Sequence, residues 1–190
     1  MIKKFFVSLL LLLVAYCFLP TAASAQKRRD SLTEAEIELV RDAQAIDART
    51  AIFIRAVERR FLVLNNQTAP QDKKSKNDDG KWGEPPAGTR LELLTDIKKI
   101  LASAIDNIDD AAAHDKMDDK LFPKAVRKLA EASNKFLPEL KAELDKATSE
   151  KEKGAILSAI ESCEQVIEAS AKVPKEEVKE VKKEKKKKSR

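Results

Sequence analysis

The residue types best suited to chemistry gather in one acidic stretch, DNIDDAAAHDKMDD, at 106–119. Within it, intervals of four residues separate Asp106, Asp110, His114 and Asp118, so a helix continued that far would place them on one face. An imidazole with several carboxylates can bind a transition metal, and the carboxylates alone suit Ca²⁺. The alternative is a solvated acidic face at a fraying helix end. We favour the alternative, because the stretch lacks an EF-hand loop and the chain has a single histidine.

Other candidate catalytic groups are isolated from one another. His114 has the chemistry of a general base, but the spacing suggests no nucleophile or orienting group beside it. Cys163 lies between Ile160 and Ile167 on an expected apolar stripe, which favours a small buried hydrophobe over a redox thiol. The chain contains no phosphate-binding glycine loop, serine-based catalytic motif or C-x-x-C-H haem attachment. We therefore expect a protein that is not an enzyme and carries no cofactor.

The C-terminal segment 172–190 is strongly basic. It contains nine Lys and one Arg against four Glu, a net charge of +6, whereas 26–171 has a net charge of −3. We expect this segment to be disordered and self-repelling. It could bind another protein or, without sequence preference, an anionic envelope polymer, a lipid surface or nucleic acid. A tail that only keeps the protein in solution is slightly favoured. The candidate polyanion-binding residues are Lys182, Lys183, Lys185, Lys186, Lys187, Lys188 and Arg190.

The periodicity of the apolar residues predicts helices throughout the body of the chain. They recur every three or four positions, and no stretch alternates with the period of two that strands require. A first helix is expected over about 33–64, on the order of 48 Å long, opened by a capping box between Thr33 and Glu36. Further helices are expected from Thr89, from near Leu121 and from Ser149. Pro138 predicts a kink or break in the third.

These segments predict an all-α fold, an antiparallel bundle of about four helices in a domain spanning 26–171. A long, partly isolated helical hairpin is the main rival. The composition of 65–88 predicts a disordered loop, which Trp82 is expected to tack onto the bundle. The basic residues of the first helix are expected on a solvated face, paired with acidic residues of a neighbouring helix. They are Arg49, Arg55, Arg59 and Arg60.

The first 25 residues have the anatomy of a secretory signal peptide. Two lysines precede an apolar run at 5–19, and a small-x-small cleavage site, Ala23-Ser24-Ala25, follows. Cleavage after Ala25 would leave Cys163 as the single cysteine, so an internal disulfide is excluded. We expect export to the periplasm or the medium, with no transmembrane helix in the mature chain. Retention of the segment as a membrane anchor is the alternative.

The sequence thus favours an exported, non-enzymatic helical bundle that acts through protein or polyanion contacts in the cell envelope or outside the cell. The alternative is a periplasmic bundle that binds a metal or another cation on the face formed by 106–118. Neither composition nor spacing identifies a partner.

Overall fold

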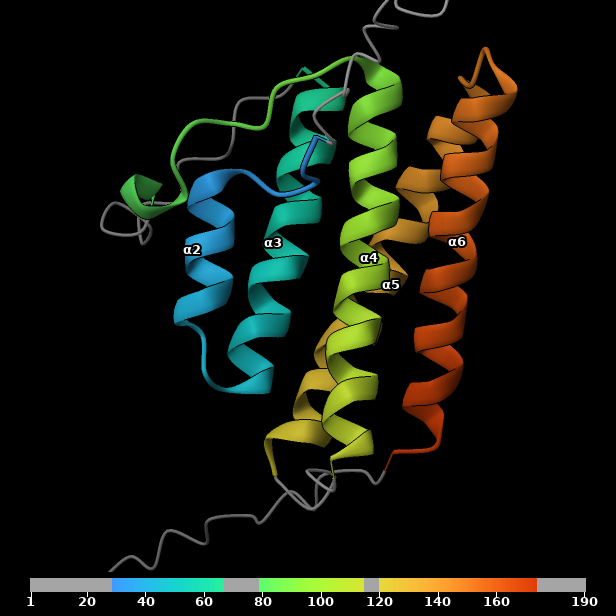
Figure 1. Ribbon diagram of the computed structural model, residues 1–190. Helices are drawn as coiled ribbons and strands as arrows, with labels where there is room; N and C mark the ends of the chain where they lie inside the picture. Colours follow the sequence, from blue (N-terminus) through green and yellow to red (C-terminus); the bar gives the residue numbers. More distant parts are fainter. Residues whose placement is uncertain (1–28, 67–78, 115–119, 174–190) are drawn as a thin grey trace, which may run out of the picture.

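The computed structural model describes residues 29–66, 79–114 and 120–173, and every element of regular structure in these ranges is a helix (Figure 1). The prediction of an all-α fold is confirmed. The expected signal peptide and the candidate tail residues 182–190 lie outside the described residues. The helices are α2 (Glu34–Asp42), α3 (Ile46–Leu64), the short 3-10 helix η1 (Asp79–Trp82), α4 (Arg90–Ala113), α5 (Leu121–Asp145) and α6 (Glu150–Ala171).

Four helices make the bundle: α3 and α6 each pack against both α4 and α5. The two helices of each hairpin, α3–α4 and α5–α6, run in opposite directions (Figure 1). The main contacts between the hairpins join parallel helices, α3 with α5 and α4 with α6. Near the starts of α3 and α5, Asp47 pairs with Lys124, and near the starts of α4 and α6, Arg90 lies 3.7 Å from Glu152. The antiparallel arrangement expected from the sequence therefore holds within each hairpin and not between them.

Apolar side chains from all four helices fill the core. The rings of Phe61 on α3 and Phe136 on α5 lie 5.6 Å apart at their centres. Cys163 on α6 is fully buried, and burial raises the pKa of its thiol to about 11, although interaction with Ser133 lowers it by a smaller amount. The thiol therefore stays protonated at neutral pH, and its expected role as a small buried hydrophobe is confirmed.

Helix α5 continues through Pro138 without a break. Proline cannot donate a hydrogen bond to the carbonyl four residues earlier, here that of Asn134. Both Pro138 and Asn134 are exposed, so water can reach this side of the helix. Of the kink or break expected at Pro138, the break is absent, because α5 is continuous from Leu121 to Asp145.

The prediction of a single long first helix over 33–64 is wrong. The capping box between Thr33 and Glu36 is present, but the helix it opens ends at Asp42. The backbone is extended at Ala43 and Ala45, and the chain then reverses into α3. Helix α2 lies alongside α3 on the outside of the bundle (Figure 1). Contacts that are distant in sequence cause this reversal and are described below.

Part of the loop expected to be disordered is ordered. Residues 67–78 lie outside the described residues, but 79–88 form η1 and an extended strap that runs to the start of α4. Pro86 is buried, and the Arg59 guanidinium lies 5.6 Å from the centre of the Trp82 ring. Trp82 thus fastens the loop to the bundle, as expected.

The packing of Phe53 gives a test of the fold. Its side chain is 6% exposed within the core, so Phe53→Ala should lower the free energy of unfolding by about 3–5 kcal/mol, measured by urea denaturation. Leu157→Ala is the matched control, since Leu157 is 52% exposed and should lose no more than about 0.5 kcal/mol. A loss below about 1 kcal/mol for Phe53→Ala would place this ring outside a packed core.

Candidate functional site

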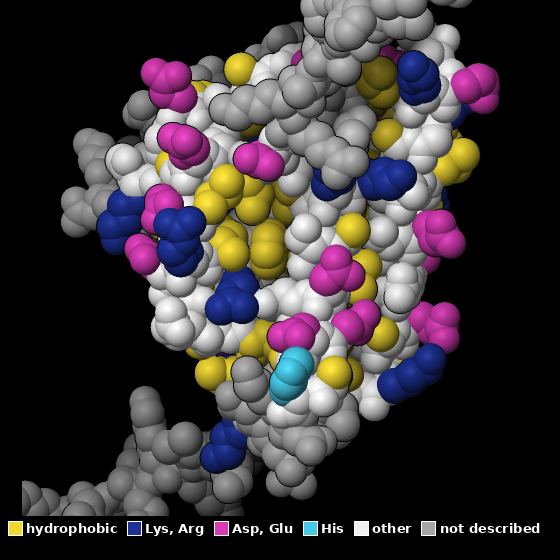
Figure 2. All heavy atoms as spheres, in the orientation of Figure 1, with side chains coloured by type: hydrophobic (Ala, Val, Ile, Leu, Met, Phe, Trp, Pro, Cys, Tyr) yellow, Lys and Arg dark blue, Asp and Glu magenta, His cyan; other side chains and the backbone are white. Residues whose placement is uncertain are grey.

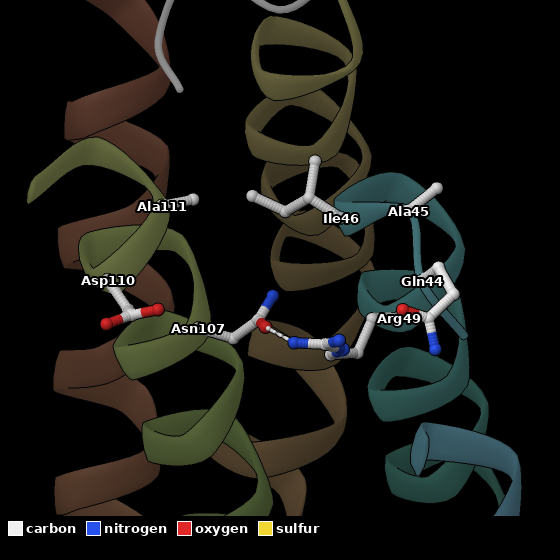
Figure 3. Close-up of a pocket in the computed structure, with 7 residues that line it drawn as sticks. All are labelled: Gln44, Ala45, Ile46, Arg49, Asn107, Asp110 and Ala111. Carbon is white, nitrogen blue, oxygen red and sulfur yellow. Dashed lines mark hydrogen bonds between the residues drawn. The ribbon is translucent and has the colours of Figure 1, made fainter. Parts of the chain in front are cut away.

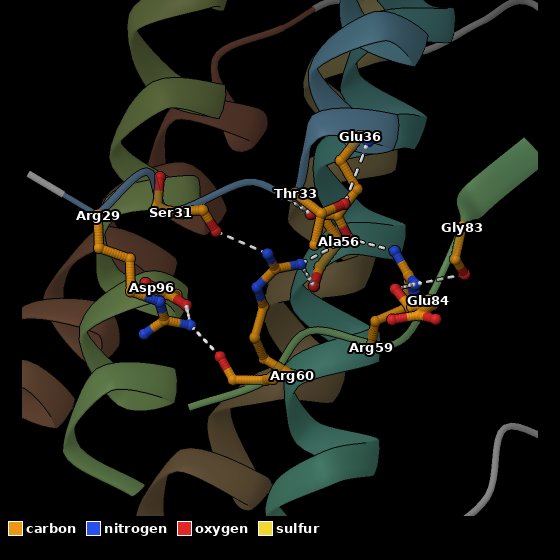
Figure 4. Close-up of polar contacts among 11 residues, drawn as sticks. Arg29, Ser31, Thr33, Glu36, Ala56, Arg59, Arg60, Gly83, Glu84 and Asp96 are labelled. Carbon is orange, nitrogen blue, oxygen red and sulfur yellow. Dashed lines mark hydrogen bonds and ion pairs between the residues drawn. The ribbon is translucent and has the colours of Figure 1, made fainter. Parts of the chain in front are cut away.

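The most unusual feature of the described residues is a carboxylate buried between two arginines, here called the buried charge cluster: Glu36, Arg59 and Arg60 (Figure 4). Glu36 on α2 is fully buried, and Arg59 and Arg60 on α3 are 8% and 1% exposed. One carboxylate oxygen, Oε1, accepts hydrogen bonds from Arg59 Nη1 at 2.6 Å and from Arg60 Nη1 at 2.7 Å. The other, Oε2, accepts from the Thr33 backbone N–H at 2.9 Å. Glu36 therefore caps its own helix and joins it to α3.

Each arginine also donates to backbone carbonyls of other segments, although the buried Nε of Arg60 has no hydrogen-bond partner. Arg60 Nη2 donates to Ser31 O at 2.6 Å, just ahead of α2. Arg59 Nη2 donates to Gly83 O and Glu84 O in the strap. The cluster thus connects α3 to the chain on either side of it in sequence. Guanidinium groups suit this role because each carries five donors in one plane.

Burial and ion pairing act in opposite directions on Glu36. Burial by itself raises the pKa of its carboxyl group, because a charge loses its hydration. The hydrogen bonds from Arg60 and from the Thr33 N–H, with the charges of both arginines, outweigh burial and hold the pKa below its ordinary value. Glu36 is therefore ionised at neutral pH and gives the adjacent guanidinium groups a counter-charge.

A second buried carboxylate lies beside the cluster. Asp96 on α4 is 3% exposed, and Arg29 Nη2 lies 2.9 Å from its Oδ2 (Figure 4). Burial raises the pKa of Asp96 to about 6, even though the charges of Arg29 and Arg60 act to lower it. A Cβ atom at Gly88 would lie 2.8 Å from an Arg29 nitrogen, so glycine leaves space for this guanidinium. Arg29 thus fastens the beginning of the described chain to α4.

At the other end of α2, Arg49 holds the chain reversal in place (Figure 3). Its Nε and Nη2 donate to Ala43 O at 3.2 and 3.0 Å, and its Nη1 donates to Asn107 Oδ1 on α4 at 3.0 Å. A hollow of about 130 Å³ lies beside these groups, lined also by Gln44, Ala45 and Asp110. It is smaller than the roughly 300 Å³ of the smallest usual ligand pockets.

Another set of polar contacts joins helix ends at the opposite end of the bundle from this reversal. Arg90, at the start of α4, forms an ion pair with Glu143 near the end of α5 and donates to its backbone carbonyl. Lys146 Nζ lies 2.8 Å from Glu143 Oε1. Burial raises the pKa of Glu143, but its bonds to Lys146 and Arg90 outweigh this and lower it. These contacts fix how the two hairpins meet.

The face predicted to bind a cation is only partly described. Asp106, Asp110 and His114 are exposed on α4 and at its C-cap, and Asp118 lies outside the described residues. His114 Nδ1 lies 2.8 Å from Asp110 O and 3.3 Å from Asp110 Oδ1, so these two residues are brought together. In the described ranges, no group of three or more His, Cys, Asp or Glu is placed to hold a metal ion.

The expectation for the basic residues of the first helix is wrong in part for all four. Arg49 and Arg55 are half-buried, and Arg49 donates to Ala43 O and Asn107 while Arg55 pairs with Glu58 of its own helix. Arg59 and Arg60 are buried rather than on a solvated face, although they do pair with an acidic residue of another helix. One signal was available in the sequence, because Arg60 lies three residues after Val57 and four before Leu64, on the same apolar stripe. Nothing in the sequence indicated Glu36 as their partner, since its capping role already explained it.

The face of the molecule drawn in Figure 2 carries charges of both signs. Figure 2 shows acidic and basic side chains scattered over one face, with hydrophobic side chains between them. Among the large hydrophobic residues that the structure describes, Leu157 is the exposed one. None of the described helices is long and apolar enough to span a bilayer. Most of the charge-bearing groups above thus serve contacts inside the protein.

Comparison with known proteins gives no relative: no family model, no curated protein and no solved structure matches the chain.

The buried charge cluster predicts a large difference between two equivalent substitutions in α2. Glu36→Gln should lower the free energy of unfolding by about 3 kcal/mol, because it leaves two guanidinium groups buried without a counter-charge. Glu38→Gln makes the same chemical change at an exposed residue paired with Arg41, and it should cost less than about 1 kcal/mol. Urea denaturation at pH 7 measures both. Equal, small losses would contradict a structural role for the cluster.

Proposed function

We propose that this protein is an exported, non-enzymatic helical bundle whose basic C-terminal segment attaches it to anionic polymers or surfaces of the cell envelope or its surroundings. The observation that carries the proposal is the separation of charge along the chain. Segment 172–190 has a net charge of +6, while 26–171 has a net charge of −3. Attraction to a polyanion therefore has its source at one end of the chain.

The geometry of the bundle supports a role in binding rather than in catalysis. Glu36, Asp96 and Glu143 combine burial with shifted pKa values, and each is paired with an arginine. In a catalytic site, such a group would face a nucleophile or a substrate-sized cavity. In the described part of the chain, the partners of these three carboxylates are groups that hold helices or chain segments together, although Asp96 also lines an open hollow of about 470 Å³. The bundle is best understood as a rigid carrier for the segment that follows it.

The chemistry of the tail sets the character of the proposed contact. Each basic residue near an anionic surface contributes on the order of 1 kcal/mol before the cost of ordering the chain. Segment 172–190 has no aromatic residue to stack on bases or sugars. Binding should therefore be electrostatic, indifferent to nucleotide sequence, and strongly weakened by salt as the gain from counterion release falls.

Three forms of the protein test the proposal: the exported protein, a form ending at Ala171, and a full-length form with Lys182, Lys183 and Lys185–Lys188 changed to Gln. Each is titrated with anionic vesicles and with a DNA duplex at low and physiological salt. We expect binding by the exported form alone, weakened at least tenfold by the added salt, with equal melting temperatures for all three. Intact mass should show that the exported form begins at Gln26.

Equal binding by all three forms would contradict the role of the tail and direct attention to the arginines of α3. Failure of the exported form to bind either anion at low salt would leave the tail as a solubilising segment. Recovery of the protein in the membrane with Met1 retained would contradict export in cleaved form.

A further inference from the structure

The break between α2 and α3 occurs where the local sequence does not call for one. The connecting residues are Ala43, Gln44 and Ala45, and both alanine and glutamine are good helix formers. Ala45 is the N-cap of α3 and makes no side-chain capping hydrogen bond. Glycine, proline and the usual capping residues Ser, Thr, Asp and Asn are all absent from the connection. The backbone reverses without any of the usual sequence signals.

The apolar stripe of the two helices also continues across the break. Its members follow at alternating intervals of four and three, as one uninterrupted helix would require: Leu39, Ala43, Ile46, Thr50 and Phe53. Local preference and periodicity therefore both favour a continuous helix from Glu34 to Leu64. Contacts with distant residues enforce the closed hairpin, with the buried charge cluster at one end and the Arg49 hydrogen bonds at the other.

Helix α2 is held to the bundle by both polar and apolar groups, since Ile37 and Leu39 are also partly buried. Glu36 is the one residue of α2 that is fully buried, while Leu32 and Val40 are partly buried against the core. Opening the hairpin would uncover these side chains and would also separate Glu36 from Arg59 and Arg60. A second copy of the chain carries the same carboxylate and the same arginines, so exchange between copies can restore every one of these bonds.

We propose that α2 is an exchangeable arm through which two copies of this protein associate. In each copy, residues 34–64 form one continuous helix, and α2 packs on α3 of the second copy, with Glu36 placed between the second copy's Arg59 and Arg60. The two long helices then run antiparallel about a twofold axis near residue 48, midway between Glu36 and its two arginines. The contacts of Glu36 with Arg59 and Arg60 are preserved, whereas the Arg49 bonds to Ala43 O are replaced by a helical hydrogen bond at the hinge. The hinge and the protein concentration therefore set the balance between monomer and dimer.

A proline substitution at the hinge distinguishes the closed monomer from the exchanged dimer, because proline fits only the closed hinge. Ala45 has φ −80° and ψ 137°, which proline adopts readily, whereas proline inside a continuous helix removes a hydrogen bond and clashes with the preceding turn. Ala45→Pro should therefore fold as the closed monomer. Ala45→Gln is the matched control, because glutamine keeps the backbone N–H and a high helix preference.

The first experiment refolds each protein from urea over a range of concentrations up to about 1 mM, where weak association becomes visible, and measures mass by light scattering after size exclusion. We expect a dimer fraction that rises with concentration for the unmodified protein and for Ala45→Gln, and monomer alone for Ala45→Pro. Monomer alone for the unmodified protein, or an equal dimer fraction for Ala45→Pro, would overturn the proposal.

The second experiment measures a distance within one chain. Spin labels are attached at Glu34→Cys and Asn65→Cys, with Cys17 and Cys163 changed to Ala, and the labelled protein is refolded with a large excess of unlabelled protein. Both positions are exposed. In the dimer fraction the labels should lie about 46 Å apart along a continuous helix, and in the monomer fraction they should be much closer. A dimer with the short distance would associate by another surface and would refute arm exchange.

Discussion

The position of the N-terminal part of this protein depends on one ionised carboxylate. Glu36 is fully buried, and its Oε1 lies 2.6 and 2.7 Å from the guanidinium nitrogens of Arg59 and Arg60. A buried charge is costly unless it is paired and hydrogen-bonded, and here the carboxylate receives bonds from two arginines and a backbone N–H. Because the same arginines also bind carbonyls at Ser31 and at 83–84, this single group positions the chain before α2, α2 itself and the strap ahead of α4.

Two kinds of interaction therefore stabilise different parts of the molecule. Apolar packing holds α3, α4, α5 and α6 together, with Phe61 and Phe136 in contact across two of them. Polar groups decide how the rest is attached and how the helix ends meet. Hydrophobic packing tolerates many similar arrangements of the helices, whereas hydrogen bonds to particular backbone carbonyls select one of these arrangements.

The features that could be predicted from the sequence are those that short-range patterns determine. The positions of α4, α5 and α6 follow from their apolar periodicity and from capping residues such as Thr89, which accepts a bond from the Glu92 N–H as expected. The reversal at 43–45 could not be predicted this way, because Ala43 and Ala45 favour a helix and the cause lies in contacts more than 20 residues away. The same holds for the site: Asp110 and His114 are neighbours by spacing alone, but the pairing of Glu36 with Arg60 exists only in the folded chain.

An ionised Glu36 holds α2 against the bundle, so the behaviour of α2 should follow the titration of this carboxyl group. Carbon-13 NMR of the Glu36 side chain across pH 2–7 would give its pKa, while hydrogen exchange of the α2 amides in the same samples reports whether the helix remains docked. We expect a pKa below the ordinary value of 4.5. The stability that the ionised carboxylate contributes should be present above 4.5 and should be lost, together with the protection of the α2 amides, as pH falls through the folded-state pKa. A pKa at or above 4.5, or α2 amides that stay protected after Glu36 is protonated, would contradict this role of Glu36.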